Sequence, residues 1–168
     1  MPKITLTDFV DIVSKSGTPK ATKVAQVKNR AAYDPRQDFY RAARERIVET
    51  HQKGHDKAFL RRVLVGLTDP KKITSYPEII KGYTRWWGRK SLSWFTPPSD
   101  LFAVHGVDVS VNPELGLEIN GDRHIIKLYF KDDALTKTKS DIVTHLMETC
   151  LRPRIKGVAT TSTSGVRG

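Results

Sequence analysis

Residues 107–131 alternate apolar and polar side chains, and this alternation restricts the possible folds more than any other feature of the chain. A period of two is typical of half-buried β-strands. Asn112-Pro113 interrupts the ladder because proline has no N–H to donate, and Asn120-Gly121 suits a tight hairpin turn because both residues tolerate positive φ. We therefore predict three short antiparallel strands, over residues 107–111, 115–119 and 123–131.

An amphipathic helix is predicted directly after these strands, from Lys137 to Leu151. Its apolar residues form one stripe at helical spacing: Ile142, Val143, Leu146, Met147, Cys150 and Leu151. A stripe of this kind packs on the face of a sheet. Residues 100–151 are therefore predicted to form a β-meander covered by the helix.

The chain before residue 100 is predicted to be helical. Helices are predicted to start at a cap on Thr5 or Thr7, at Thr18-Pro19, at Asp34-Pro35, near Asp56 and at the capping box Ser75-x-x-Glu78, and Thr68-Asp69-Pro70 is predicted to start a short turn that ends at Ile73. The predicted fold class is α+β, with a basic helical region over 1–99, the meander and helix over 100–151, and a flexible basic tail over 152–168.

The formal net charge of the 168 residues is +11, and it is unevenly placed. Residues 101–151 carry eight acidic and five basic side chains, whereas the rest of the chain is basic. A basic surface beside an acidic patch is expected of a protein that holds a polyanion. DNA or RNA is therefore the predicted partner; simple solvation of helix faces by Lys and Arg is the alternative.

An aromatic and basic segment, GYTRWWGRKSLSWF, joins the helices to the strands. Bases stack on aromatic rings, and cations neutralise phosphates. The same aromatics would also serve as a hydrophobic junction between the two halves. The residues predicted to contact nucleic acid are Arg85, Trp86, Arg89 and Lys90, together with Arg41, Arg44, Arg61 and Arg62 on the earlier helices.

One reaction centre can be proposed from the strands. Asp108 and Glu118 are expected to face each other across the first two strands, with Lys127 projecting from the third. Two carboxylates provide the hard oxygen ligands that Mg²⁺ requires, and a lysine beside them would activate water or stabilise developing charge. If the protein is a nuclease, these three residues are catalytic and the two carboxylates hold the metal. Solvent-facing ion pairs are the alternative.

This arrangement resembles the PD-(D/E)XK restriction-endonuclease-like superfamily, over residues 100–151 only. In that superfamily an acid on one strand precedes an acid-x-Lys on the next, as Asp108, Glu118 and the following helix suggest here. Glu118-Ile119-Asn120 has asparagine in place of the lysine, and Tyr129-Phe130-Lys131 has tyrosine in place of the acid. The resemblance therefore implies a degenerate nuclease-like core.

The expected function is nucleic-acid binding, in a phage, mobile-element or host-defence setting. A Mg²⁺-dependent phosphodiesterase or nuclease, and a protein-interaction module whose acidic sheet docks a basic partner, are the alternatives. The sequence has no run of about 18 apolar residues, so no membrane span is predicted. The first residues lack the apolar core of a secretory signal. With one cysteine, Cys150, the chain has no internal disulfide. A cytoplasmic protein is predicted, with no cofactor unless a nuclease binds Mg²⁺.

Overall fold

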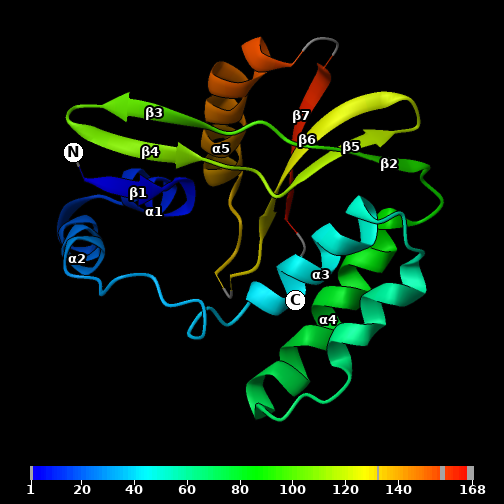
Figure 1. The fold of residues 1–168 in the computed structure, drawn as a ribbon. Coiled ribbons are helices and arrows are strands. Elements are labelled where there is room, and N and C mark those ends of the chain that lie inside the picture. Colours follow the sequence, from blue (N-terminus) through cyan, green and yellow to red (C-terminus); the bar gives the residue numbers. More distant parts are fainter. Residues whose placement is uncertain (1, 132, 156–157, 166–168) are drawn as a thin grey trace.

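The strands form two separate sheets in the computed structural model, which describes residues 2–131, 133–155 and 158–165 (Figure 1). The smaller sheet has the order β1-β4-β3, and the larger one β2-β5-β6-β7. The strands are β1 (Lys3–Thr5), β2 (Leu92–Phe95), β3 (Asp100–Val104), β4 (Val107–Val111), β5 (Leu115–Ile119), β6 (Asp122–Tyr129) and β7 (Val158–Gly165).

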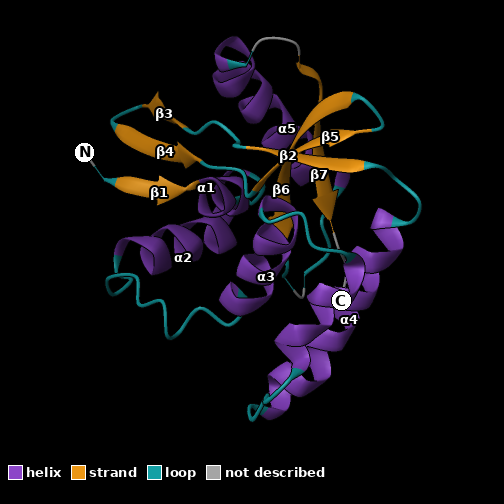
Figure 2. Ribbon diagram, turned by 45° about the vertical axis from the view of Figure 1, so that its right-hand side comes forward, coloured by secondary structure: helices purple, strands orange, loops and turns teal. Residues whose placement is uncertain are grey.

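Helices pack against both sheets (Figure 2). The α-helices are α1 (Leu6–Val13), α2 (Gly17–Lys28), α3 (Arg41–Gln52), α4 (Pro70–Trp87) and α5 (Lys137–Leu151), and the 3₁₀ helices are η1 (Lys57–Leu64) and η2 (Arg152–Arg154). The predicted α+β class is confirmed, and so are the predicted bounds of α5. None of the helices within the described ranges is long and apolar enough to span a bilayer.

The predicted hairpin of β5 and β6 at Asn120-Gly121 is confirmed, and β4 and β5 have the predicted bounds, but the predicted pairing of β4 with β5 is wrong. β4 pairs with β1 and β3, whereas β5 pairs with β2 and β6. The chain changes sheets at Asn112-Pro113, where proline cannot extend the ladder. The antiparallel neighbours in the larger sheet are therefore β2, β5 and β6, and β7 runs parallel to β6.

The larger sheet is buried on both faces, because consecutive residues of β6 point to opposite sides. Ile126 packs in a core with α3, η1 and α4, which includes Leu60, Tyr76 and Tyr83. Ile125 packs on the other side with α1, β4 and α5. Helices thus cover each face of the larger sheet. The candidate site lies where β5 begins and β6 ends.

The interior between α3 and α4 contains one hydrogen-bonded polar pair. Nε2 of His51 lies 2.7 Å from the hydroxyl oxygen of Tyr83, and both side chains are buried. Burial lowers the pKa of His51 to about 4 and raises the pKa of Tyr83. The imidazole and the phenol are therefore both neutral at physiological pH.

Two predicted helix starts differ from the structure. Asp34 accepts a hydrogen bond from the backbone N–H of Arg36 at 2.9 Å, which closes a turn, and α3 begins only at Arg41. Ser75 does not begin a helix, because α4 runs without interruption from its cap at Asp69 through Pro77. Burial of the α4 face that carries Tyr76 and Tyr83 outweighs the hydrogen bond lost at the proline.

The predicted tail, residues 152–168, contains a strand within its described part. Residues 158–165 form β7 beside β6. The prediction of a flexible segment rested on its Ser, Thr and Gly content and did not anticipate this pairing. Residues 156–157 and 166–168 lie outside the described part of the chain.

Candidate functional site

The three residues proposed as a reaction centre do not come together. Asp108 lies on β4, opposite Lys3 of β1 and Ala103 of β3. Glu118 lies on β5 in the other sheet, opposite Ser93 and Arg123. The expectation that Asp108 and Glu118 face each other across neighbouring strands is therefore wrong, since their strands are not neighbours.

Lys127 instead pairs with Glu114, which was not among the residues predicted for the reaction centre. Nζ of Lys127 donates to Oε1 of Glu114 at 2.6 Å and to the carbonyl oxygen of Asn112 at 3.0 Å. Both charged side chains are mostly buried, with 13% of Lys127 and 17% of Glu114 exposed. An acid directly before β5 thus meets a lysine on β6, the neighbouring strand of the larger sheet.

Glu114 also completes the backbone hydrogen bonding of β6. Its Oε2 accepts from the N–H of Leu128 at 2.7 Å, while its own N–H donates to the carbonyl of Ile126 at 3.2 Å. Pro113 precedes it and has no N–H, so the ladder between β5 and β6 ends here. The carboxylate therefore takes the place of the missing strand partner.

The hairpin turn at Asn120-Gly121 predicts that Glu114 lies opposite Lys127. A two-residue turn at Asn120-Gly121 places Ile119 opposite Asp122. Continued outward, the same register places Glu118 opposite Arg123 and Glu114 opposite Lys127. The signal was therefore available from the turn and the strand period together.

Glu114 and Lys127 line a cleft of about 680 Å³, which we call the polar cleft. Its walls come from α1, α2, the segment between α2 and α3, the start of α3, the residues before β5 and the end of β6. Five cations and three carboxylates line it: Lys23, Arg30, Arg44, Lys127 and Lys131, with Asp8, Asp38 and Glu114.

Each carboxylate of the polar cleft is held by a cation. Asp8 accepts two hydrogen bonds from the guanidinium of Arg30, both at 2.9 Å. Asp38 accepts from Arg44, as Glu114 does from Lys127. No carboxylate lining this cleft is left without a basic partner.

These contacts favour the ionised carboxylates. Burial raises the pKa of Asp8, but hydrogen bonds from Arg30 and Thr5 and the nearby positive charges outweigh it, so the pKa is below its usual value. Burial likewise raises the pKa of Asp38, and the hydrogen bonds from Tyr33 and Arg44 bring it below the usual value. The cleft is thus built of charged pairs at neutral pH.

A second ionic group lies behind the cleft and joins α1 to α5. Asp11 accepts a hydrogen bond from Lys131 and lies 3.3 Å from Nζ of Lys139. Lys139 is only 7% exposed and also donates to Asp133 at 2.5 Å. Burial opposes the charged form of Lys139, yet its acidic partners raise its pKa overall. The group thus fixes the first turn of α5 against α1.

The carboxylates do not form a cluster suited to a metal ion. Among the described residues, no three His, Cys, Asp or Glu side chains converge closely enough to hold one. Asp108 and Glu118, the two expected Mg²⁺ ligands, lie in different sheets, and Glu114 is engaged by Lys127 and Leu128. The donor set of this chain therefore does not fit the expected two-carboxylate site.

The residues predicted to contact nucleic acid fall into two groups. Arg41 pairs with Glu45 at 2.6 Å, and Arg44 pairs with Asp38. In contrast, no carboxylate of the described residues lies within 4 Å of Arg61, Arg62, Arg85 or Arg89. The first group therefore has its charge compensated within the protein, and the second does not.

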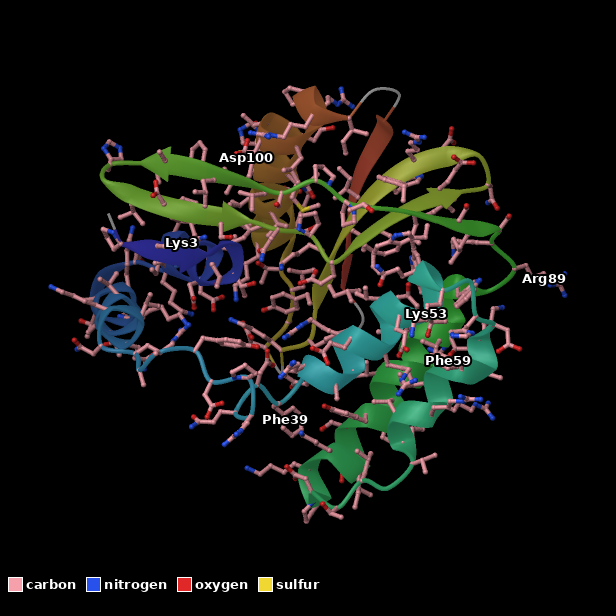
Figure 3. All side chains as sticks on the ribbon, in the orientation of Figure 1. Lys3, Phe39, Lys53, Phe59, Arg89 and Asp100 are labelled. Carbon is pink, nitrogen blue, oxygen red and sulfur yellow. The ribbon has the colours of Figure 1, made fainter. Side chains whose placement is uncertain are left out.

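The second group lies on η1 and around the C-terminal end of α4. Together with Lys57 and Lys90, we call these residues the basic corner: Lys57, Arg61, Arg62, Arg85, Arg89 and Lys90. A short connection joins the end of η1 to the start of α4, so the two helices run in opposite directions. Nζ of Lys57 donates to the carbonyl of Gly88 and thereby ties the start of η1 to the end of α4. Figure 3 shows Arg89 projecting outward there.

The tryptophans of this region serve mainly as the hydrophobic junction. Trp86, Trp87 and Trp94 are half-buried and pack against the core beneath α4. Nζ of Lys90 lies 5.1 Å from the centroid of the Trp86 ring, a distance suited to a cation–π contact. Trp86 therefore supports a cation at the surface rather than presenting a bare ring.

The chain matches no protein-family model, no curated protein and no solved structure.

Proposed function

We propose that this protein is a cytoplasmic nucleic-acid-binding protein that holds the phosphate backbone at its basic corner. The observation that carries the proposal is the contrast between paired and unpaired arginines. Arg61, Arg62, Arg85 and Arg89 have no carboxylate within 4 Å among the described residues, whereas Arg30, Arg41 and Arg44 are each held by one. An uncompensated arginine releases counterions from a phosphate without first losing an internal partner.

The elements that carry the basic corner are anchored in the hydrophobic core, which lowers the entropic cost of binding. Leu60 of η1 and Tyr83 of α4 are fully buried, so the backbone that carries the arginines is fixed to the core. Lys57 and Lys90 are held against Trp87 and Trp86. Less conformational entropy is therefore lost when these cations meet phosphates.

The pair Glu114–Lys127 supports a relationship to nuclease-like proteins. As in the resemblance stated above, an acid stands before a lysine on the next strand, and an amphipathic helix follows. The residue two before Lys127 is Ile125, where the motif would have a second acid. We therefore propose a degenerate core that binds without cutting, in a phage, mobile-element or host-defence setting.

A Mg²⁺-dependent phosphodiesterase is the second candidate, and the 2.6 Å contact between Glu114 and Lys127 is what favours it. In that case Glu114 and Lys127, and neither Asp108 nor Glu118, would be required. The basic corner would then orient the substrate strand.

One titration tests both candidates. Binding of labelled single-stranded and duplex DNA and RNA is followed by anisotropy from about 50 to 200 mM salt, with Mg²⁺ present, and the products are run on a denaturing gel. Tight binding with a steep salt dependence and intact strands is the expected result. Strand cleavage that is prevented by EDTA and abolished by Glu114→Gln would contradict the binding-only proposal and support the phosphodiesterase. Absence of binding at about 150 mM salt would overturn both.

A further inference from the structure

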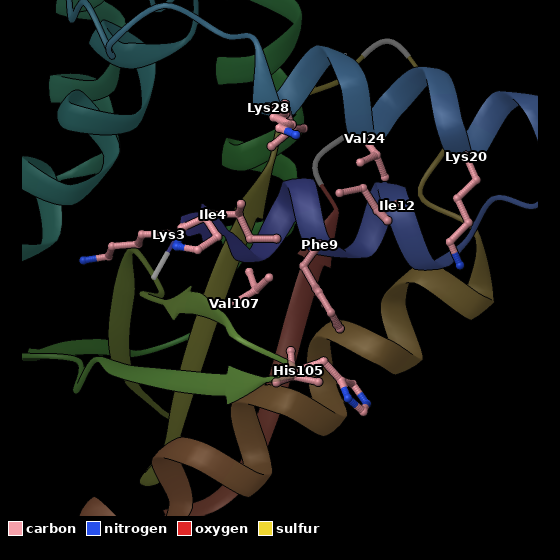
Figure 4. Close-up of a pocket in the computed structure, with 12 residues that line it drawn as sticks. Lys3, Ile4, Phe9, Ile12, Lys20, Val24, Lys28, His105 and Val107 are labelled. Atoms are coloured by element: carbon pink, nitrogen blue, oxygen red, sulfur yellow. The ribbon is translucent and has the colours of Figure 1, made fainter.

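A second depression, which we call the apolar groove, shares no lining residue with the polar cleft or the basic corner. It has a volume of about 820 Å³ and lies between α1, α2, β1 and the turn that joins β3 to β4 (Figure 4). Its floor and walls are mostly apolar, with Phe9 and Ile12 from α1, Val24 from α2 and Val107 from β4. A volume of this size is typical of a binding site rather than of a packing defect.

The helix that forms one wall of the apolar groove is poorly covered. None of the residues of α2 is buried, and Val24 is 42% exposed. A 12-residue helix is marginal by itself in water. The ion pairs of Lys23 with Asp8 and Asp11 hold α2 in place. The apolar face of α2 thus has room for a partner.

The groove-lining face of α2 carries a cation at each end. Lys20, Val24, Val27 and Lys28 line the groove and fall at i, i+4, i+7 and i+8, which is one side of a helix. Figure 4 shows Lys20 and Lys28 on either side of Val24, and Val24 directed toward Ile12. Eight residues of helix separate the two lysines by roughly 12 Å along the axis.

The charge of the apolar groove is entirely positive. Lys3 is the third lysine in its lining, and no acidic residue lines it. No carboxylate of the described residues lies within 4 Å of these three lysines. An occupant with apolar and acidic groups would therefore complement both the walls and the rim.

We propose that the apolar groove binds an acidic amphipathic helix of a partner protein. The apolar stripe of that helix lies on Phe9, Ile12 and Val24. Its carboxylates meet Lys20 and Lys28 at the two ends. A helix laid in a groove in this way is a recurrent mode of peptide recognition.

The spacing of the lysines favours a peptide over a single-headed amphiphile such as a fatty acid. One carboxylate would engage Lys20 or Lys28 but not both, since roughly 12 Å of helix lies between them. A helical partner places acidic side chains one turn or more apart along one edge, so both lysines are engaged. The site does not depend on nucleic-acid binding, because the basic corner lies on η1 and α4.

The test uses the full chain and a designed helical probe. The probe is a fluorescein-labelled peptide of about 14 residues, with Leu at i, i+3, i+4 and i+7 and Glu on both flanks. A control peptide has Lys in place of every Glu. Saturable anisotropy with the acidic peptide and none with the basic peptide is the expected result.

Two matched pairs of variants locate the binding site. Val24→Glu puts a charge in the apolar wall and should abolish binding, whereas Gln26→Glu adds the same charge to the opposite side of α2 and should not. Lys20→Gln with Lys28→Gln should weaken binding at least about tenfold. Thr22→Glu with Gln26→Glu makes the same change in net charge and should leave binding within about twofold. Circular dichroism of each variant checks that α2 is retained.

Three results would overturn the proposal. The first is equal binding of the acidic and the basic peptide, and the second is an equal effect of the variants on the two sides of α2. The third is that the protein binds dodecanoate or DNA but not the acidic peptide, and that Val24→Glu abolishes this binding. The first would indicate non-specific association, and the third a different occupant.

Discussion

The imidazole of His51 and the phenol of Tyr83 share a hydrogen bond of 2.7 Å between α3 and α4. Both groups are neutral in the folded protein, since burial lowers the pKa of His51 and raises that of Tyr83. No carboxylate stands in this pair to stabilise an imidazolium. Protonation of His51 therefore works against the packing of the two helices.

This pair predicts a loss of stability in mild acid. Unfolded His51 titrates near 6.5 and the folded side chain near 4, so the unfolded state binds more protons between these pH values. The free energy of unfolding should therefore fall by about 3 kcal/mol as the pH decreases through this range. Urea titrations at several pH values measure it. His51→Gln should flatten this dependence, whereas His55→Gln should retain it; equal slopes in both variants would refute the assignment.

A second prediction concerns the carboxylate that terminates the ladder of the larger sheet. Glu114→Ala leaves the N–H of Leu128 without its acceptor and Lys127 with only the carbonyl oxygen of Asn112, so it should destabilise the fold by about 2 kcal/mol in urea denaturation. Glu114→Gln keeps an oxygen for the N–H of Leu128 and should cost clearly less. Glu118→Ala, which removes a half-exposed carboxylate of the same sheet, serves as the control and should change stability by less than about 0.5 kcal/mol.

The distinction between compensated and uncompensated arginines gives a third prediction. Arg85→Gln and Arg89→Gln should each reduce the slope of log K against log salt by about one. Arg41→Gln should change it less, because Glu45 already holds that guanidinium. Lys137→Gln, on an exposed lysine of α5, is the control for net charge alone. An equal reduction of the slope in all four variants would show that the net charge of the protein, and not the basic corner, determines binding.

The close approach of β2 and β5 gives a fourth prediction. Gly116 lies opposite Phe95, and a Cβ added there would lie 2.8 Å from Cε2 of the Phe95 ring and closer still to its carbonyl oxygen. Gly116→Ala should therefore destabilise the protein by about 2–3 kcal/mol through overpacking. Gly106→Ala has open space around its Cβ and a positive φ, so it should cost only about 1 kcal/mol. Thermal and urea denaturation of both variants check the difference.

Local patterns predicted the elements of the second half of the chain well. The alternation around Val109 and Leu117 gave the bounds of β4 and β5, and the apolar stripe around Leu146 gave those of α5. The turn at Asn120-Gly121 predicted the pairing of β5 with β6, but the other strand partners were missed, because alternation shows which face is buried and not which strand lies alongside. β1 and β2 contribute three and four residues, too few for a clear period.

The residues of the candidate site were predicted in part. Lys127 was identified, but its acid was sought on the regular strands at Asp108 and Glu118 rather than beside the proline at Glu114. The basic residues were identified from composition and spacing alone. Which of them are compensated depends on long-range contacts such as that between Arg30 and Asp8, and no local pattern indicates those.

The parallel pairing of Lys3 with Asp108 bears on how the chain is made as well as on how it is held. During synthesis, β1 emerges from the ribosome long before its partner β4 exists, so it must wait unpaired while more than one hundred residues are added. The same delay applies to α1, whose core neighbours lie on β4 and α5. The smaller sheet should thus close late, and the waiting segment is the one most exposed to chaperones and proteases.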